Sequence, residues 1–172
     1  LKRALDFTRA CVRQDIIGFR APSFTITHKT LWAFDILAKH GIAYDSSIFP
    51  IGFHPDYGIA DEPLSIHPIG ALTEVPMSVA DVLGKKIPCS GGGYFRLFPY
   101  AVTQFLIKRC NRQGRPVIFY LHPWEIDPDQ PRRKLSMTKS LRHYINLDKT
   151  LTRLDRLLTD FQFTSIRKVL GR

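Results

Sequence analysis

Apolar positions along this chain follow two different spacings, and the two spacings alternate. Short apolar runs bounded by glycine, proline or polar residues are typical of strands, and they occupy residues 15–20, 42–45, 72–78 and 116–122. Apolar side chains at every third or fourth position are typical of helices, and they occupy residues 1–12, 27–40, 99–112 and 146–161. Residues 163–170 read as a last strand or a closing segment. This alternation predicts an α/β fold with parallel strands.

The run at residues 116–122 is the most informative, because it stops at a histidine. Pro123 follows His122 directly, and proline cannot continue a sheet ladder. We therefore expect a buried strand with one imidazole at its carboxyl end. In parallel α/β folds this end of the sheet is where ligands bind and where chemistry takes place.

Two other predicted strands also end in a polar group. Arg20 ends the first of them and Asp45 ends the second, with a predicted helix between them. This strand–helix–strand order predicts parallel neighbours, so the ends of both strands lie at one edge. In a parallel barrel the carboxyl ends of all strands share one face, so Arg20, Asp45 and His122 would share one site if their three strands belong to such a barrel.

The composition fits a single globular domain, expected to span residues 1–172, with 44% hydrophobic and 12% aromatic residues. No segment approaches the roughly 18 consecutive apolar residues that indicate a membrane span. The three cysteines are widely spaced and odd in number, so we expect buried hydrophobes rather than a disulfide framework. The polar, proline-containing stretches at residues 50–70 and 123–146 are predicted loops.

The net charge of +10 lies in the second half of the chain. Residues 1–86 contain 9 Lys/Arg and 9 Asp/Glu, whereas residues 87–172 contain 16 Lys/Arg and 6 Asp/Glu. A basic half of this kind attracts anionic lipids, acidic glycans or nucleic acids, or forms a solvated helical face. The spacings of the RRM, KH and zinc-finger motifs do not occur, so we expect no nucleic-acid partner.

The residues at the predicted strand ends indicate acid–base chemistry. An arginine holds a carboxylate in a charge-assisted pair and keeps it ionised, which suits the orientation of a general base. His122 can act as a general acid, a general base or a metal ligand, or form a half-buried structural contact. Tyr120 and Trp124 beside it form an apolar wall suited to a sugar ring, or belong to the core.

Other chemistries lack their motifs. The other histidines never form HxxxH or HxH, so the sequence predicts no metal site in this chain. The glycines at 91–93 are not followed by Lys-Ser or Lys-Thr, so they do not form a phosphate-binding loop. Ser78 and Ser90 lie outside any GxSxG motif. These observations disfavour nucleophilic and phosphate-binding chemistry.

Five short motifs follow one another along the chain: Phe19–Phe24 (FRAPSF), Tyr44–Ser47 (YDSS), Gly91–Tyr94 (GGGY), His122–Glu125 (HPWE) and Arg142–Leu147 (RHYINL). Together they resemble the polysaccharide deacetylases of the NodB-homology, or carbohydrate esterase 4, family. The similarity is greatest to the subgroup associated with exopolysaccharide and exosortase loci. Each motif is short, but five in order make the resemblance specific, and it covers nearly the whole chain.

This resemblance implies a distorted (β/α) barrel with its site at the carboxyl ends of the strands. The implied reaction is deacetylation of an N- or O-acetylated polysaccharide, with water activated by a divalent metal that is expected to be zinc. In that reaction His122 protonates the leaving amine, Leu121 lines the acetyl pocket and Arg20 orients the base carboxylate. Asp45 either tunes His122 or caps a turn. An acidic polysaccharide partner would suit the basic second half of the chain.

The family's aspartate pair and its HxxxH-like ligands precede the arginine motif, and this chain contains neither. We therefore expect the C-terminal part of a barrel, with the N-terminal strands missing, that supplies the arginine and histidine half of the site. We expect no tight metal binding and no catalysis by this chain alone. One alternative is a non-catalytic glycan-binding or scaffold module with a barrel-like fold. Another is a binder of anionic polymers with salt-sensitive affinity.

Overall fold

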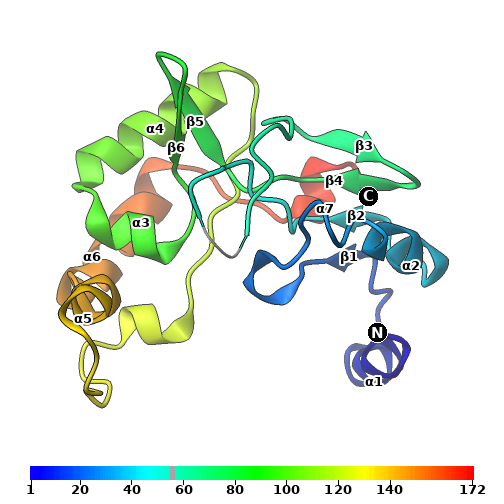
Figure 1. Cartoon of the computed structure of the whole chain (residues 1–172), viewed down its shortest axis with the longest axis horizontal. Helices are drawn as coiled ribbons and strands as arrows, with labels where there is room; N and C mark the ends of the chain where they lie inside the picture. The colour runs from blue at the N-terminus through cyan, green and yellow to red at the C-terminus, as the bar shows by residue number, and fades with distance from the viewer. Residues whose placement is uncertain (55–56) are drawn as a thin grey trace. The chain divides into compact units, whose positions relative to one another are not determined.

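The structure is a computed structural model that describes residues 1–54 and 57–172. These residues form two compact units, Leu1–Met77 and Ser78–Arg172, which Figure 1 colours from blue to red along the chain. The single domain predicted for residues 1–172 stays a prediction. Within the described residues no closed barrel is present, and the strands and helices confirm a mixed α/β chain.

The N-terminal unit is built on a four-stranded sheet with strand order β1-β2-β4-β3. Its strands are β1 (Gly18–Phe19), β2 (Tyr44–Asp45), β3 (His67–Ile69) and β4 (Leu72–Glu74). The parallel pairing of β1 with β2 and of β2 with β4 confirms the predicted strand–helix–strand order, whereas β3 runs antiparallel to β4. The strands are shorter than predicted, and β4 ends at Glu74, before Pro76, which has no N–H to donate.

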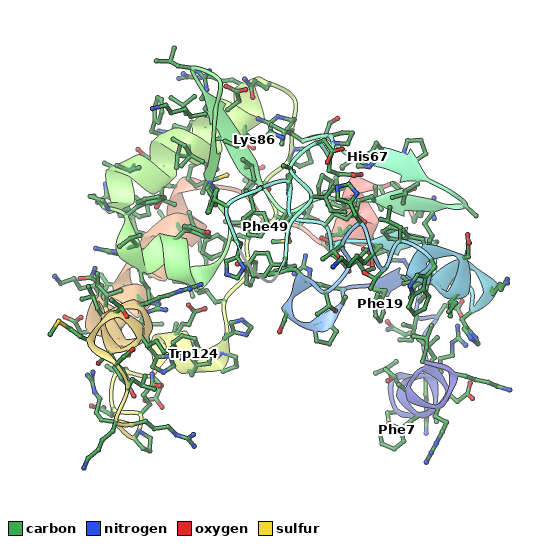
Figure 2. All side chains as sticks on the ribbon, in the orientation of Figure 1. Phe7, Phe19, Phe49, His67, Lys86 and Trp124 are labelled. Carbon is green, nitrogen blue, oxygen red and sulfur yellow. The ribbon has the colours of Figure 1, made fainter. Side chains whose placement is uncertain are left out.

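Two helices of the N-terminal unit were predicted, α1 (Lys2–Val12) and α2 (Ala33–Lys39). Helix α2 is shorter than the predicted 27–40, because the residues before it form turns. Helix α1 buries Leu5, while Phe7 on the same helix is 73% exposed and projects away from it in Figure 2. Apolar side chains from both helices, from β4 and from the connecting segments form the core: Leu5, Ala21, Ile26, Phe34, Leu37, Ile42, Ile48, Ile59 and Leu72.

The C-terminal unit begins with a hairpin that the sequence pattern missed. Strand β5 (Val79–Val82) pairs antiparallel with β6 (Lys85–Pro88). The connecting Leu83 and Gly84 both have positive φ, at 53° and 78°. The Asp81 carboxylate accepts a hydrogen bond from the Gly84 N–H at 2.9 Å, which stabilises this turn. Leucine is an unusual residue at such a position, so the turn carries no strong sequence signal.

Helices make up most of the C-terminal unit. They are α3 (Gly92–Leu97), α4 (Tyr100–Arg112), α5 (Met137–Tyr144), α6 (Leu147–Asp160) and α7 (Ile166–Val169). The prediction of α4 and α6 is confirmed. Residues 163–170 were predicted to form a last strand or a closing segment, and the strand is wrong, because Ser165 accepts a hydrogen bond from the Lys168 N–H and starts α7 there. None of the helices in the described part of the chain is long and apolar enough to span a bilayer.

The buried strand predicted at residues 116–122 is also wrong, because these residues join no sheet ladder. The apolar run that predicted it is nevertheless packed: Val117, Phe119 and Leu121 lie against the cluster of Phe95, Ile107 and Leu157. The Ile118 N–H donates to the Ser78 hydroxyl at 2.7 Å. The segment therefore covers apolar side chains by packing on helices, and prolines at 116 and 123 remove donors at both ends.

The two predicted loops contain short elements. Strand β3 lies in the stretch 50–70, whose Pro55 falls outside the described residues. The 3-10 helix η2 (Pro123–Ile126) and helix α5 lie in the stretch 123–146. The prediction of buried cysteines is confirmed for Cys89 and Cys110 and wrong for Cys11, which is exposed.

Candidate functional site

In the N-terminal unit, Arg20 joins the ends of three parallel strands. Arg20 follows β1, and its Nε and Nη2 donate to the Ser46 carbonyl and hydroxyl, both at 2.8 Å. The Ser46 hydroxyl in turn donates to the carbonyl of Val75, directly after β4, at 2.7 Å. This network confirms that Arg20 and the end of β2 lie at one edge of the sheet.

Asp45 is wholly buried at the same edge. Its carboxylate accepts the Ser47 N–H at 2.7 Å and the Ser47 hydroxyl at 2.9 Å, while the Ser47 hydroxyl accepts the Ala21 N–H at 2.7 Å. This geometry fits the capping of a turn, which is one of the two roles considered for Asp45. Burial raises the pKa of Asp45, although the bonds from Ser47 and the charge of Arg20 oppose that rise.

Glu74 is a buried partner of Asp45 that the sequence analysis missed. The two residues are register neighbours on β4 and β2, and neither side chain is exposed. The Glu74 Oε1 accepts the Ile48 N–H at 3.0 Å, whereas its Oε2 has no hydrogen-bond partner among the described residues. Burial, followed by the charge of Asp45, raises the pKa of Glu74 to about 9. A proton on Glu74 that is donated to Asp45 supplies the missing hydrogen bond.

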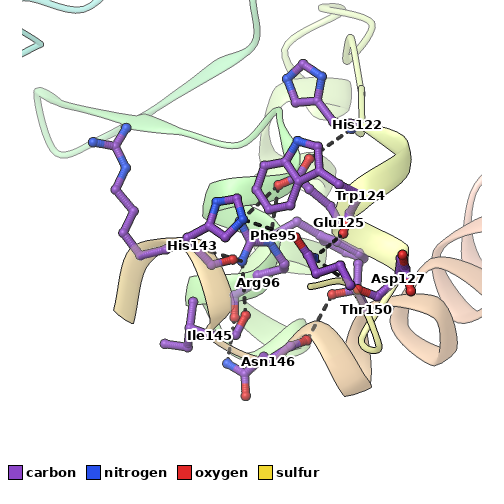
Figure 3. A network of polar contacts seen from close by, with 12 residues as sticks. Phe95, Arg96, His122, Trp124, Glu125, Asp127, His143, Ile145, Asn146 and Thr150 are labelled. Atoms are coloured by element: carbon purple, nitrogen blue, oxygen red, sulfur yellow. Dashed lines mark hydrogen bonds and ion pairs between the residues drawn. The ribbon is translucent and has the colours of Figure 1, made fainter. Parts of the chain in front are cut away.

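In the C-terminal unit, a buried ion pair lies at the centre of the network shown in Figure 3. Arg96 of α3 meets Glu125 of η2 at 3.1–3.2 Å, and the two side chains are only 2% and 3% exposed. The Arg96 Nη1 also donates to the carbonyls of His143 at 2.8 Å and Ile145 at 3.2 Å. Arg96 therefore connects α3, η2 and the segment between α5 and α6.

Glu125 fixes the backbone of His122. Its Oε2 accepts the His122 N–H at 2.9 Å, and its own N–H donates to the His122 carbonyl at 2.9 Å. The imidazole takes no part in these bonds. The residue is exposed, and Figure 3 shows its ring turned away from the Arg96–Glu125 pair. The sequence analysis selected His122 but not the acidic residue that holds it.

The glycine run before α3 provides space for this network. A Cβ on Gly92 would lie 2.0 Å from the Glu125 Oε2, and a Cβ on Gly91 would lie 2.5 Å from the Tyr120 hydroxyl. A Cβ on Gly93 would meet no atom within 4 Å. Two of the three glycines are therefore required by close packing.

Aromatic rings continue from His122 along one side of the network. The Tyr120 ring lies edge-on to the His122 ring at 5.9 Å, and the Trp124 ring is nearly parallel to the His122 ring at 6.2 Å. Trp124 stacks on His143 at 4.3 Å, with the Arg96 guanidinium 5.0 Å from the centre of the indole. We call Tyr120, His122, Trp124 and His143 the aromatic row. Leu121 is half-buried and packs towards the Phe95 cluster.

Three motifs noted in the sequence therefore meet in one place. Arg96 lies two residues after the GGGY motif, Glu125 ends HPWE, and His143 belongs to RHYINL. None of these three residues was predicted to act in the site. Their signal was present, because motifs that are distant in the chain each contain one polar residue that the network uses.

The structure does not bring all the predicted site residues together within one unit. Arg20 and Asp45 belong to the N-terminal unit, whereas Tyr120, Leu121, His122 and Trp124 belong to the C-terminal unit. One site shared by both sets stays a prediction. Among residues 1–54 and 57–172, no three His, Cys, Asp or Glu side chains gather closely enough to hold a metal ion. The described side chains thus do not fit the implied divalent metal.

Comparison with known proteins finds one family. No curated protein and no solved structure matches the chain. A family model described as a domain of unknown function (DUF3473) matches residues 46–171. The match begins directly after Asp45 and includes Arg96, Glu125, the aromatic row and α5. Because it covers most of the chain, this protein belongs to the DUF3473 family.

Proposed function

We propose that this chain supplies the proton donor of a polysaccharide deacetylase, and that His122 is that donor. The DUF3473 family is known as part of polysaccharide deacetylase-like proteins, which supports the proposal. The substrate is an N-acetylated or O-acetylated polysaccharide of exopolysaccharide biosynthesis or modification. The two α/β units are then part of a distorted (β/α) barrel of the NodB-homology type.

The exposed imidazole of His122 is the observation that carries this proposal. A general acid must reach the leaving nitrogen and keep a constant orientation. Both backbone polar groups of His122 are bonded to Glu125, and Glu125 is itself held by Arg96. The imidazole is thus free to meet a substrate while the backbone that presents it is fixed.

In the proposed reaction, His122 supplies the proton that the leaving nitrogen needs. Water adds to the acetyl carbonyl, the carbon–nitrogen bond breaks, and the nitrogen takes its proton from His122 as acetate leaves. By the resemblance, Arg20 orients a base carboxylate that this chain does not contain and that accepts a proton from water, and Asp45 maintains the turn at the end of β2. These assignments involve only acid, base and hydrogen-bonding groups of the protein.

The aromatic row provides the sugar-binding surface in this proposal. Trp124 is half-buried and lies nearly parallel to the His122 ring, so a sugar ring that stacks on the indole lies next to the imidazole. Tyr120 extends the row on the other side of His122. Leu121 contributes an aliphatic contact for the acetyl methyl group.

A second function is a glycan-binding or scaffold module without catalysis. Trp124 stacks on His143 and contacts the Arg96 guanidinium, so it forms a rigid aromatic surface that does not depend on a catalytic role of His122. This alternative predicts glycan binding without acetate release. The two functions therefore differ in product formation and not in affinity.

The test measures acetate release from an oligomer of N-acetylglucosamine by the complete protein. We expect His122→Ala to lower the rate by about 10²–10⁴-fold. The melting temperature should change little, since the two main-chain hydrogen bonds between His122 and Glu125 remain in this variant. His28→Ala, at an exposed histidine in the N-terminal unit, is the matched control and should keep full activity. Retained activity in His122→Ala would refute the assigned donor, and binding without any hydrolysis by the unchanged protein would favour the module.

A further inference from the structure

The segment that leads into α5 is the most cationic part of the molecule. Between residues 131 and 147 the chain has five Lys or Arg residues and no Asp or Glu. All five are exposed: Arg132, Arg133, Lys134, Lys139 and Arg142. No acidic side chain within this stretch offsets their charge.

Large aliphatic side chains are exposed among these cations. Met137 is 88% exposed, Leu141 is 65% exposed and Leu135 is 41% exposed. Met137 and Leu141 are four residues apart in α5 and therefore lie on the same face of the helix. They line an open groove together with Leu135, Ser140, Tyr144 and Ile145. Exposed aliphatic groups on a continuous surface of this kind indicate an interaction site.

Contacts within the C-terminal unit keep these side chains on the outside. The other side of α5 is used by His143, which stacks on Trp124, and Arg96 bonds the backbone at the end of the helix. Tyr144 holds the preceding segment against α5. Its hydroxyl accepts the Arg133 N–H at 2.9 Å, and the Arg132 guanidinium lies 4.3 Å from its ring. Figure 2 shows side chains around α5 extending away from α3 and α4.

We infer that this surface, the α5 patch of five cations with Leu135, Met137 and Leu141, docks the protein onto an anionic phospholipid membrane. A helix that lies on a membrane needs an apolar face for the acyl region and cations for the headgroups. The α5 patch combines both on α5 and on the segment directly before it. The inference goes beyond the proposed deacetylation and does not depend on it.

The aliphatic residues favour a lipid over the other polyanions. An acidic glycan pairs with cations but offers no acyl phase to bury Met137 and Leu141. Single-stranded nucleic acids stack their bases on aromatic side chains, and the exposed residues of the α5 patch that are not charged are mainly aliphatic. Of these polyanions, only a lipid surface uses both components of the patch.

The experiment is sedimentation of the full chain with lipid vesicles. We expect binding to vesicles of phosphatidylglycerol mixed with phosphatidylcholine, much weaker binding to phosphatidylcholine alone, and weakening as sodium chloride is raised. Absence of binding to the anionic vesicles at low salt would overturn the inference.

Paired variants separate the two components. The double variant Met137→Ser/Leu141→Ser should bind anionic vesicles at least about tenfold more weakly than the unchanged chain, because the aliphatic insertion is lost. The variant Arg133→Gln/Lys134→Gln/Lys139→Gln should bind about a hundredfold more weakly. Leu83→Ser is the matched control, because Leu83 is 94% exposed in the β5–β6 turn, and it should bind like the unchanged chain.

The melting temperature of each variant checks that the chain remains folded. We expect it to be unchanged, because all the substituted side chains are exposed. Unchanged vesicle binding by the serine double variant would overturn the membrane inference. A second result would also overturn it: the unchanged chain binds a soluble polyuronate as tightly as it binds anionic vesicles, and the serine double variant keeps that affinity for the polyuronate. The patch would then serve an acidic glycan.

Discussion

Two buried glutamates are used in different ways in this chain. Glu125 meets Arg96 in an ion pair and bonds the backbone of His122. Glu74 faces another carboxyl group, that of Asp45, and its pKa is raised to about 9 by burial and by that neighbour. The first glutamate needs its charge to hold three elements together. The second is stable in the folded unit only when one proton lies between the two carboxyl groups.

Glu74 should therefore make stability depend on pH. Its pKa is higher in the folded chain than the usual value of 4.5, so the folded state binds more protons between about pH 4.5 and pH 9. The free energy of unfolding should fall as pH rises through this window, by up to about 1.4 kcal/mol per pH unit. Glu74→Gln should lower this slope, as measured by chemical unfolding at several pH values. Asp61→Asn, at a 79% exposed side chain, is the control, and an unchanged slope in Glu74→Gln would contradict the shared proton.

Gly92 and Gly93 give a matched pair of single-residue tests. Gly92→Ala places a Cβ against the Glu125 carboxylate and should lower the free energy of unfolding by about 1–3 kcal/mol. Gly93→Ala adds a Cβ in open space on the same helix and should be neutral or slightly stabilising. Chemical unfolding of both variants decides the question. Equal effects would mean that the space at Gly92 is not needed for the ion pair.

At the scale of elements, one guanidinium joins α3, η2 and the chain between α5 and α6. Arg96 and Glu125 are both buried, so neither charge can be satisfied by water when its partner is removed. The carbonyls of His143 and Ile145 also depend on Arg96 for their hydrogen bonds. Three short elements with little core of their own therefore act as one rigid support for the aromatic row.

Removing one partner of this pair should be costly. Glu125→Ala leaves the Arg96 charge buried and frees the His122 N–H, so we expect a loss of about 3–5 kcal/mol in the free energy of unfolding. The double variant Arg96→Met/Glu125→Gln removes both charges and should recover part of that loss. Urea unfolding of the two variants gives the comparison. A double variant that is less stable than Glu125→Ala would contradict this coupling of the two charges.

Sequence reasoning succeeded for elements whose signal is local. Helices α4 and α6 have a continuous apolar stripe and a clear start, and the parallel strands β1 and β2 follow from the helix between them. It failed at 116–122, where the apolar run packs on helices instead of pairing with a strand. The β5–β6 hairpin was missed because its turn uses Leu83 at positive φ. A short apolar run indicates that side chains are buried and does not indicate what covers them.

The candidate site, like the fold, was predictable only where its signal is local in the sequence. His122 and Trp124 stand out in a short motif, and the structure places them side by side. Glu125 and Arg96 could not be paired from the sequence, because 28 residues separate them and only the tertiary fold joins them. Glu74 had one local signal, since it shares a strand face with the buried Leu72. That signal marks a buried carboxyl group without naming its partner.

At the scale of the whole molecule, acidic and basic groups are distributed unequally. The first half of the chain has no net charge, and the second half has the full net charge of +10. The cations of the second half also have two distinct uses. Arg96 and Arg153 are bonded to the backbone within the C-terminal unit, whereas the α5 patch faces solvent. Binding to anionic vesicles should therefore depend on the cations of the α5 patch. Substituting these cations should leave the folding of the chain unchanged.

The proposed reaction makes a chemical distinction that a single pair of substrates can reveal. An amine is a poor leaving group and needs a proton as the carbon–nitrogen bond breaks, whereas an aryl oxide leaves without one. If His122 is the proton donor, its loss should matter for an amide and not for an aryl ester. A structural role for His122 would affect both substrates equally.

The decisive measurement compares kcat/KM of the complete protein and of His122→Ala on an N-acetylglucosamine oligomer and on an aryl acetate. We expect the variant to lose about 10²–10⁴-fold on the amide and less than about tenfold on the ester, with little change in the melting temperature. Equal losses on both substrates, or full activity of the variant on the amide, would contradict the role of His122 as the proton donor.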